Sequence, residues 1–306
     1  HFLIYLIHVI LVQNPLRLCS LYMSEITAKQ KFTQDTLKRL TGKKISYDEI
    51  KDKYLKLLSH LQYKRTLMIA GSQGSGKSTL SVLIKKFFLK FYSKNVVVLS
   101  IDDFYLSSNQ RKQLVRKFNS DLFKTRGVPG THNLKLLYKI TNNLIKKKFP
   151  VYIPVFDKVT DNKKNYKRKI NKADLIILEG WCVGSKPIDM KYLKKNINNL
   201  EKKNDFNLIW RTAYNNALID YQKLFKKFDY YIFIKLPNWD YVINWKYKQE
   251  LGLRSLNSDN RLKKSLYQFI KYYEKLSKWM SSTTPSYCNV LITLDKNQSI
   301  KKITYK

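Results

Sequence analysis

Short apolar runs alternate with amphipathic segments from residue 66 onward. Most of these runs do not alternate apolar with polar positions, which is the pattern of strands covered by helices on both faces. We therefore expect a largely parallel sheet with strands at 66–70, 96–101, 151–156, 174–180, 230–236 and 289–295.

The segments between the runs have helical spacing. Apolar residues at positions 80, 83, 84, 87, 88 and 91 follow the i, i+3, i+4, i+7 pattern, and a similar stripe recurs at 214–224. Residues 239–284 have a helical pattern rich in Lys, Arg and aromatic residues and are a candidate for a mobile lid. The Lys/Asn-rich stretches at 157–172 and 191–205 predict surface loops or short helices.

The length and composition allow one large α/β domain. The chain has 306 residues, of which 44% are apolar, enough for a substantial core. We expect a non-native or leader segment at 1–22, a polar helical segment at 23–63 and the main P-loop domain at 64–306, within which 239–284 forms a lid or a helical insertion.

The first residues are apolar but do not form a convincing targeting signal. The run from Phe2 to Val12 is too short to span a bilayer, has no basic region before it and has no clear cleavage site after it. We interpret residues 1–22 as upstream translation or a truncated leader, with Met23 as the natural start. The alternative is a damaged signal or transit segment.

The formal net charge is +37, from 59 Lys and Arg against 22 Asp and Glu. Such a charge raises nucleic acid or a membrane surface as a partner. The alternative is a compositional bias, because Lys accompanies abundant Asn, Ile and Tyr and the charges are spread along the chain. We favour this bias, and expect no specific nucleic acid and no membrane as partners. An anionic substrate fits both interpretations.

The cysteines indicate a reducing compartment. Cys19, Cys182 and Cys288 lie far apart, and the chain has only four His, so neither a disulfide framework nor a zinc site is indicated. We expect a cytoplasmic protein, with organellar import as the alternative if residues 1–22 belong to a leader.

The stretch "GSQGSGKS" has the phosphate-loop spacing G-x-x-x-x-G-K-S. An apolar strand precedes it and a periodic helix follows it, whereas a simple Gly-rich turn at a helix start is the alternative. Backbone N–H groups would surround one anion, the lysine would reach the β- and γ-phosphates, and the serine hydroxyl would face Mg²⁺. The predicted ATP-binding residues are Gly71, Ser72, Gly74, Ser75, Gly76, Lys77, Ser78 and Thr79.

A second strand, in "VVVLSIDDFYLS", ends in two adjacent carboxylates, Asp102 and Asp103. In a strand, neighbouring side chains point to opposite faces, so both can face one site only if the strand has already ended. We expect this strand to lie beside the phosphate-loop strand, with its carboxyl end at the ligand-binding edge. A kinase needs a carboxylate there to accept the proton of the acceptor hydroxyl. The alternative is that one of the two caps a turn.

The motifs "GSQGSGKS", "SIDDFYLS", "RGVPGTHNL", "VYIPVFDK" and "IILEGWCVG" follow one another in this order. In this, the chain resembles the P-loop kinases of the phosphoribulokinase, uridine kinase and pantothenate kinase superfamily, and most closely the D-glycerate 3-kinase branch. The resemblance covers about 66–295. It implies an α/β fold, a P-loop NTPase-type three-layer sandwich with a mainly parallel central sheet and a helical lid region.

The resemblance also implies roles for the acidic residues. Asp102 takes the place of the catalytic base, Asp103 is a candidate for contacts with a Mg²⁺-bound water or the acceptor, and Tyr105 is a candidate pocket wall. Glu179 matches a strand-end acid that orients Mg²⁺, so the predicted metal residues are Ser78 and Glu179. The alternative for Glu179 is a buried acid that pairs with Lys77.

For the acceptor, the guanidinium of Arg126 suits a carboxylate. His132 is a candidate hydrogen-bond partner of a hydroxyl, or else a residue at a helix entry. Asp157 and Lys158 match a loop near the acceptor in the family, with a solvated turn as the alternative.

Three departures from the family pattern affect these assignments. Asn133 stands where the family often has Asp, and the segment after "FDK" keeps Arg168 but not the surrounding residues. Lys246 stands where a family Arg would reach over the phosphates, and Arg254 is a candidate to compensate.

The resemblance implies an ATP-dependent kinase, with Mg²⁺, that converts D-glycerate to 3-phosphoglycerate and ADP. The expected partner is thus a small hydroxy acid. One alternative is a related kinase acting on uridine, pantothenate or another alcohol. The other is a nucleic-acid-stimulated ATPase, which the high net charge would suit.

Overall fold

A computed structural model describes residues 15–254 and 258–306, with only the backbone described at 15–22 and 253–254. Its centre is a six-stranded sheet in the order β2-β5-β1-β6-β7-β8, parallel except for the edge strand β8. The strands are β1 (Thr66–Gly71), β2 (Val96–Ser100), β5 (Leu175–Gly180), β6 (Tyr230–Lys235), β7 (Val290–Leu294) and β8 (Ile300–Tyr305).

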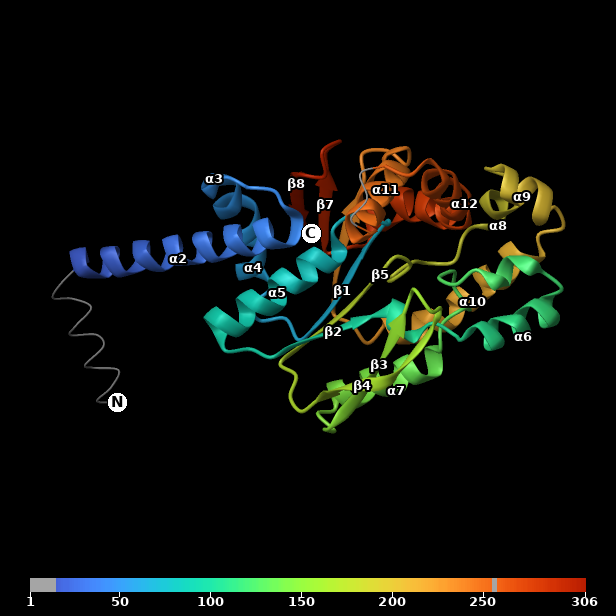
Figure 1. Cartoon of the computed structure of the whole chain (residues 1–306). Helices are drawn as coiled ribbons and strands as arrows, with labels where there is room; N and C mark the ends of the chain where they lie inside the picture. Colours follow the sequence, from blue (N-terminus) through green and yellow to red (C-terminus); the bar gives the residue numbers. More distant parts are fainter. Residues whose placement is uncertain (1–14, 255–257) are drawn as a thin grey trace.

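Helices cover both faces of this sheet, because alternate residues of its strands enter two different apolar clusters (Figure 1). One face packs against α5 (Lys77–Tyr92), and the other packs against α7 (Leu134–Ile145) and α10 (Ile209–Phe225). The α/β class with three layers and a mainly parallel sheet is therefore confirmed.

Two long helices complete the layers. Helix α2 (Pro15–Thr41) lies along α5, where Phe32 packs edge-on against Phe91, and α12 (Asn260–Thr283) places Leu276 and Met280 in the same cluster as α10. Within 15–254 and 258–306, no helix has the length and apolar character that crossing a bilayer requires.

The remaining elements are short or lie at the rim. They are α3 (Tyr47–Glu49), a π-helix (Ile50–Leu55), α4 (Lys56–His60), α6 (Ser108–Phe118), α8 (Met190–Lys194), α9 (Asn199–Asn204), α11 (Tyr241–Arg254), strands β3 (Val151–Asp157) and β4 (Asn162–Ile170), and 3₁₀ turns at Ile101–Phe104, Asp121–Lys124 and Thr284–Ser286.

Three expectations about strands were wrong. Strand β5 lies between β2 and β1, so the strand before the two carboxylates does not adjoin the phosphate-loop strand. Strand β3 does not join the central sheet, and instead forms an antiparallel hairpin with β4. Strand β4 lies where surface loops or short helices were expected, at 157–172. It was not predicted as a strand because its residues are mostly Lys and Asn, which are not typical of strands. The edge strand β8 was also not foreseen.

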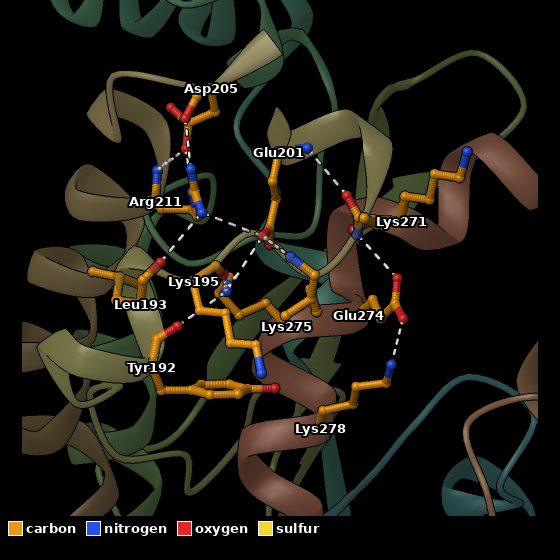
Figure 2. Close-up of polar contacts among 12 residues, drawn as sticks. Tyr192, Leu193, Lys195, Glu201, Asp205, Arg211, Lys271, Glu274, Lys275 and Lys278 are labelled. Atoms are coloured by element: carbon orange, nitrogen blue, oxygen red, sulfur yellow. Dashed lines mark hydrogen bonds and ion pairs between the residues drawn. The ribbon is translucent and has the colours of Figure 1, made fainter. Parts of the chain in front are cut away.

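A fully buried cluster of charges joins α9, α10 and α12 on the side of the molecule away from α2 (Figure 2). Arg211 has no exposed surface and pairs with Asp205 at 2.7 Å and with Glu201 at 3.3 Å. Lys275 of α12 pairs with the same Glu201 carboxylate at 3.3 Å. Since each buried charge has partners of opposite sign, the cluster fixes α12 against α9 and α10.

We predict that Arg211→Ala lowers the free energy of unfolding by about 3–5 kcal/mol, because it removes the cation that pairs with the buried Asp205 and leaves Glu201 with Lys275 alone. Urea denaturation measures the change. The matched control is Lys223→Ala on the same helix, whose ion pair with Asp220 is exposed, with an expected change below about 0.5 kcal/mol. Equal effects of the two substitutions would contradict the role given to the cluster.

Candidate active site

The phosphate loop joins β1 to α5 in a conformation that favours glycine. Gly74 and Gly76 have φ values of 75° and 87°, and α5 begins at Lys77 without a side-chain cap. The unpaired N–H groups and the positive end of the helix dipole therefore face the loop. The Gln73 Oε1 and Ser75 Oγ atoms are buried without a hydrogen-bond partner among the described residues. These features suit a bound polyphosphate.

The two reactive side chains of the loop lie beside the end of β5. Lys77 Nζ donates to the Ser72 carbonyl at 2.9 Å, and Ser78 Oγ donates to Glu179 Oε1 at 3.3 Å. Burial lowers the pKa of Lys77 and raises that of Glu179, and the attraction between the two charges opposes both shifts. Glu179 therefore contacts the serine hydroxyl and acts on Lys77 through its field.

Ser78 and Glu179 offer oxygen atoms of the kind that Mg²⁺ prefers. Within 15–254 and 258–306, no three His, Cys, Asp or Glu side chains form a group that could hold a metal by itself. A Mg²⁺ ion at Ser78 would thus depend on phosphate oxygens and water for its other ligands, as is usual for this ion in nucleotide sites.

The two adjacent carboxylates have different partners because β2 ends at Ser100 and a 3₁₀ turn follows. Asp102 accepts hydrogen bonds from Tyr105 Oη and Lys158 Nζ, both at 2.6 Å. Asp103 accepts from the Phe156 amide at 3.2 Å and from Arg168 at 3.3 Å. Asp102 thus faces the site, while Asp103 holds the β3–β4 hairpin to the turn.

The electrostatic surroundings of the two carboxylates also differ. Burial acts to raise the pKa of Asp102, but the charge and hydrogen bond of Lys158, with the Tyr105 hydroxyl, lower it to about 2. Burial raises the pKa of Asp103, against the hydrogen bond from Phe156 and the charge of Arg168. The Asp102 side chain is 30% exposed and Lys158 is 60% exposed, so their ion pair can open to solvent.

Arg126 lies over the same region but is not free. Its guanidinium pairs with Asp161 at 2.5 Å, donates to the Lys158 carbonyl at 3.2 Å and lies over the rings of Tyr105 and Phe156.

Asp161 also pairs with Arg111 of α6, so a single carboxylate is shared by two guanidinium groups. Neither Asp161 nor Arg111 was among the residues predicted from the sequence. The only available signal was that Asp157 and Asp161 are the sole acids between positions 157 and 172.

His132 is buried, with 5% of its surface exposed, between Tyr105 and Tyr221. Its Nδ1 lies 2.7 Å from Tyr221 Oη, whereas Nε2 has no partner among the described residues. Asn133 supplies the cap of α7 by accepting from the Leu136 amide at 3.0 Å. The helix entry therefore does not use the His132 ring.

The remaining predicted residues lie at the edges of this region. Asp157 accepts from the Val159 amide at 2.9 Å, in the turn of the hairpin. Lys246 pairs with Glu250 at 2.6 Å on α11. Helix α11 covers the phosphate loop closely, since a Cβ on Gly74 would lie 2.9 Å from Trp245 Cβ. Arg254 ends α11, and its side chain lies outside the described residues.

The structure therefore gathers the predicted residues at the carboxyl edge of the sheet. The phosphate loop and Glu179 stand at the ends of β1 and β5, and Asp102 follows the end of β2. Lys158 and Arg126 approach from the hairpin and from the loop before α7. This arrangement places an anion-binding loop next to a carboxylate and several cations.

Known proteins resemble this chain in sequence and fold. The sequence profile of the phosphoribulokinase / uridine kinase family matches residues 66–213. An uncharacterised kinase of Schizosaccharomyces pombe is 30% identical over 243 residues, which are 74% of this chain and 86% of that protein. The chloroplastic D-glycerate 3-kinase of Arabidopsis thaliana is 28% identical over 66% of this chain, a match that spans 44% of the Arabidopsis protein.

Among solved structures, a D-glycerate 3-kinase from Cryptococcus neoformans superposes with a TM-score of 0.67 at 19% identity. The superposition covers 92% of this chain and 99% of the other. At this identity, the match bears on the fold alone.

The burial of His132 predicts a dependence of stability on pH. Burial lowers its pKa from 6.5 to about 4, so the unfolded chain takes up a proton below pH 6.5 that the folded chain does not. Stability therefore falls as the pH drops from 6.5 towards 4, by about 2 kcal/mol between pH 7 and pH 5 from this residue alone.

His132→Gln removes that proton uptake. We expect the free energy of unfolding of the variant, measured with urea at both pH values, to fall less than that of the wild type by about 2 kcal/mol. His60, whose pKa burial also lowers, is present in both proteins, so its contribution cancels. The same pH dependence in both proteins would show that His132 titrates normally.

Proposed function

Because the chain belongs to the phosphoribulokinase / uridine kinase family of P-loop kinases, which implies ATP use, typically with Mg²⁺, we propose that it phosphorylates a small hydroxy acid. The proposed reaction transfers the γ-phosphoryl group of ATP to the primary hydroxyl of D-glycerate and yields 3-phosphoglycerate and ADP. The observation that carries the choice of an anionic acceptor is the charge balance of the ion pairs around Asp102.

Around the acceptor region, the ion pairs among the described residues join four cations to three carboxylates. Asp102 pairs with Lys158, and Asp103 pairs with Arg168. A further carboxylate, that of Asp161, is shared by the two guanidinium groups of Arg111 and Arg126, so within these pairs one positive charge has no counter-charge of its own. A mono-anionic acceptor would supply it.

Arg126 is the group proposed to bind that anion. A guanidinium has five N–H donors, and those not used by Asp161 and Lys158 could bind a carboxylate. An uncharged nucleoside such as uridine would leave the positive charge uncompensated. Pantothenate is also an acid, so the choice of glycerate over pantothenate rests on the similarity to a relative named D-glycerate 3-kinase.

We propose that the phosphate loop binds the triphosphate, with Lys77 at the β- and γ-phosphates and Ser78 on the metal side. When bound, Mg²⁺ would neutralise charge on the transferring phosphoryl group. The Glu179 carboxylate, which accepts a hydrogen bond from Ser78 in this structure, would bind the metal or one of its waters beside the serine hydroxyl.

Asp102 is the proposed base. Its carboxylate takes the proton of the acceptor hydroxyl as the hydroxyl oxygen bonds to the γ-phosphorus, and the bond from that phosphorus to the β–γ bridging oxygen breaks. A carboxylate with a pKa near 2 is a weak base, so we propose that Lys158 leaves Asp102 when the acceptor binds. Lys158 could then bind the acceptor or the phosphoryl group.

The proposed lid is α11, since Trp245 already lies against Gly74 of the phosphate loop. Lys246 extends from the same turn of α11 and is the candidate cation over the phosphates. Its ion pair with Glu250 would have to open for this role.

The function is tested by coupled ADP release from the full chain with Mg-ATP. D-glycerate, L-glycerate, uridine, pantothenate, ribulose 5-phosphate and single-stranded DNA are offered separately. We expect turnover with D-glycerate and 3-phosphoglycerate as product. Turnover with uridine alone would overturn the charge argument, and stimulation by DNA alone would support the nucleic-acid-dependent ATPase.

Asp102→Asn should lower kcat with D-glycerate about a thousandfold, because the amide cannot accept the proton. The Kd for Mg-ATP, measured by calorimetry, should stay within about twofold, since the phosphate loop is unchanged. Asp121→Asn, whose carboxylate forms an exposed ion pair with Lys124, is the matched control and should keep full turnover. Normal turnover by Asp102→Asn would exclude it as the base.

Lys158→Ala should move the acid limb of the pH profile of kcat/KM to higher pH. The substitution removes the charge and hydrogen bond that lower the pKa of Asp102, so the base loses its active, ionised form at a higher pH than in the wild type. The profile is measured between pH 4 and pH 8, a range chosen to include the ordinary carboxyl pKa. An unmoved limb would show that another group governs the acid side.

A further inference from the structure

One ring nitrogen of His132 is a buried polar atom without a partner. Among the described residues, no donor or acceptor reaches His132 Nε2, and the side chain is almost closed to solvent. An unsatisfied buried polar atom destabilises the folded state, so such atoms in folded proteins call for an explanation. A ligand atom that bonds to Nε2 would supply one.

The other ring nitrogen is held by Tyr221 of α10. Tyr221 Oη lies 2.7 Å from His132 Nδ1, and the Gly130 amide donates to the same oxygen at 3.1 Å. Burial raises the pKa of Tyr221 well above 10, so the phenol keeps its hydrogen. The phenol oxygen thus accepts from the backbone and still has one hydrogen to donate.

Two arrangements of the hydrogens are available. If Tyr221 donates to Nδ1, the phenol is fully used and the neutral ring carries its hydrogen on Nε2. If Nδ1 donates to Tyr221, the phenol hydrogen and the Nε2 lone pair are both left unsatisfied, because the other contacts of Tyr221 Oη, with the backbone of Gly130 and His132, are with donors. The first arrangement leaves fewer buried atoms unsatisfied and is favoured.

The ring also belongs to the acceptor side of the site. The backbones of His132 and Tyr105 form an isolated antiparallel β-bridge. Its hydrogen bonds run from Leu106 N to Thr131 O at 2.9 Å and from Asn133 N to Phe104 O at 2.6 Å. The rings of Tyr105 and His132 lie 5.0 Å apart, and Tyr105 donates to Asp102. Asp102 and Tyr105 therefore belong to the same turn, and the His132 ring packs against Tyr105.

We propose that Tyr221 is a positioning residue that fixes the Nε2–H tautomer of His132, so that this N–H donates to an oxygen of the bound hydroxy acid. The proposal rests on the proposed function, in which the acceptor binds between Asp102 and Arg126. It predicts selectivity for acceptors that place a carboxylate or hydroxyl oxygen at Nε2. Tyr221 does not touch the acceptor and acts through the histidine.

The tautomer is tested directly by ¹⁵N NMR of the full chain labelled at histidine. At pH 7 we expect the His132 signals, assigned by their loss in His132→Gln, to show hydrogen on Nε2 and none on Nδ1. Hydrogen on Nδ1 would overturn the proposal. Tyr221→Phe, which keeps the ring but removes the hydroxyl, should change this pattern, because Nδ1 loses its donor.

The effect on the acceptor is tested by steady-state kinetics with D-glycerate and Mg-ATP. We expect Tyr221→Phe to raise the KM for D-glycerate about 5- to 20-fold and to leave the KM for ATP within about twofold. Tyr214→Phe is the matched control, because Tyr214 lies on the same helix and is as deeply buried, with 2% of its surface exposed against 1% for Tyr221. It should leave both KM values unchanged.

The outcomes separate this proposal from the proposed function. If D-glycerate supports no turnover but the Nε2–H tautomer is observed, the choice of acceptor fails, and the kinetic test is repeated with the acceptor in the panel that does turn over. If D-glycerate is phosphorylated and Tyr221→Phe changes neither the tautomer nor the KM, the positioning role fails and the function stands. A rise in KM without a change of tautomer would likewise contradict the role given to Tyr221.

Discussion

The end of strand β2 is the constraint on which the acceptor side of the site depends. Because the strand stops at Ser100 and a 3₁₀ turn follows, two carboxylates that would have pointed to opposite faces of a sheet can serve separate partners on one side. Asp103 holds the β3–β4 hairpin through Phe156 and Arg168. The hairpin in turn places Lys158 beside Asp102. Asp103 therefore holds the hairpin in position, and the hairpin lysine sets the charge environment of Asp102.

Charge pairing is used in two different ways in this molecule. In the cluster around Arg211, every charged group is fully buried and compensated, which gives a rigid joint between α9, α10 and α12. Around Asp102 the pairs are partly exposed, apart from the buried side chain of Arg111, and they join four cations to three carboxylates. A partly solvated ion pair opens at little cost, whereas a buried pair does not. The second arrangement therefore suits a site where a ligand replaces one partner of a pair.

The sequence was sufficient to predict the elements whose signal is local. The phosphate loop, its strand and its helix, and the strand ends that carry Asp102 and Glu179 follow from short motifs and apolar periodicity. The order of the strands in the sheet could not be predicted from the sequence. A β-α-β pattern does not show whether a later strand lies between two earlier ones, as β5 lies between β2 and β1. Asp161 and Arg111 were missed because their importance lies in a contact between residues 50 positions apart, and nothing in the composition of either segment marks it.

The candidate lid at 239–284 contains two helices whose surroundings differ. On helix α12, Tyr273 Oη donates a hydrogen bond to the Arg126 carbonyl at 2.7 Å, and Ser277 Oγ accepts one from the Trp181 indole at 2.6 Å. With Lys275 in the buried charge cluster as well, any rotation of α12 would break contacts on two of its sides. Helix α11 touches the phosphate loop at Gly74 and carries the ion pair of Lys246 with Glu250, whose side chains are partly buried. We therefore propose that closure over the nucleotide is confined to α11, while α12 holds the backbone of Arg126 in place for the acceptor.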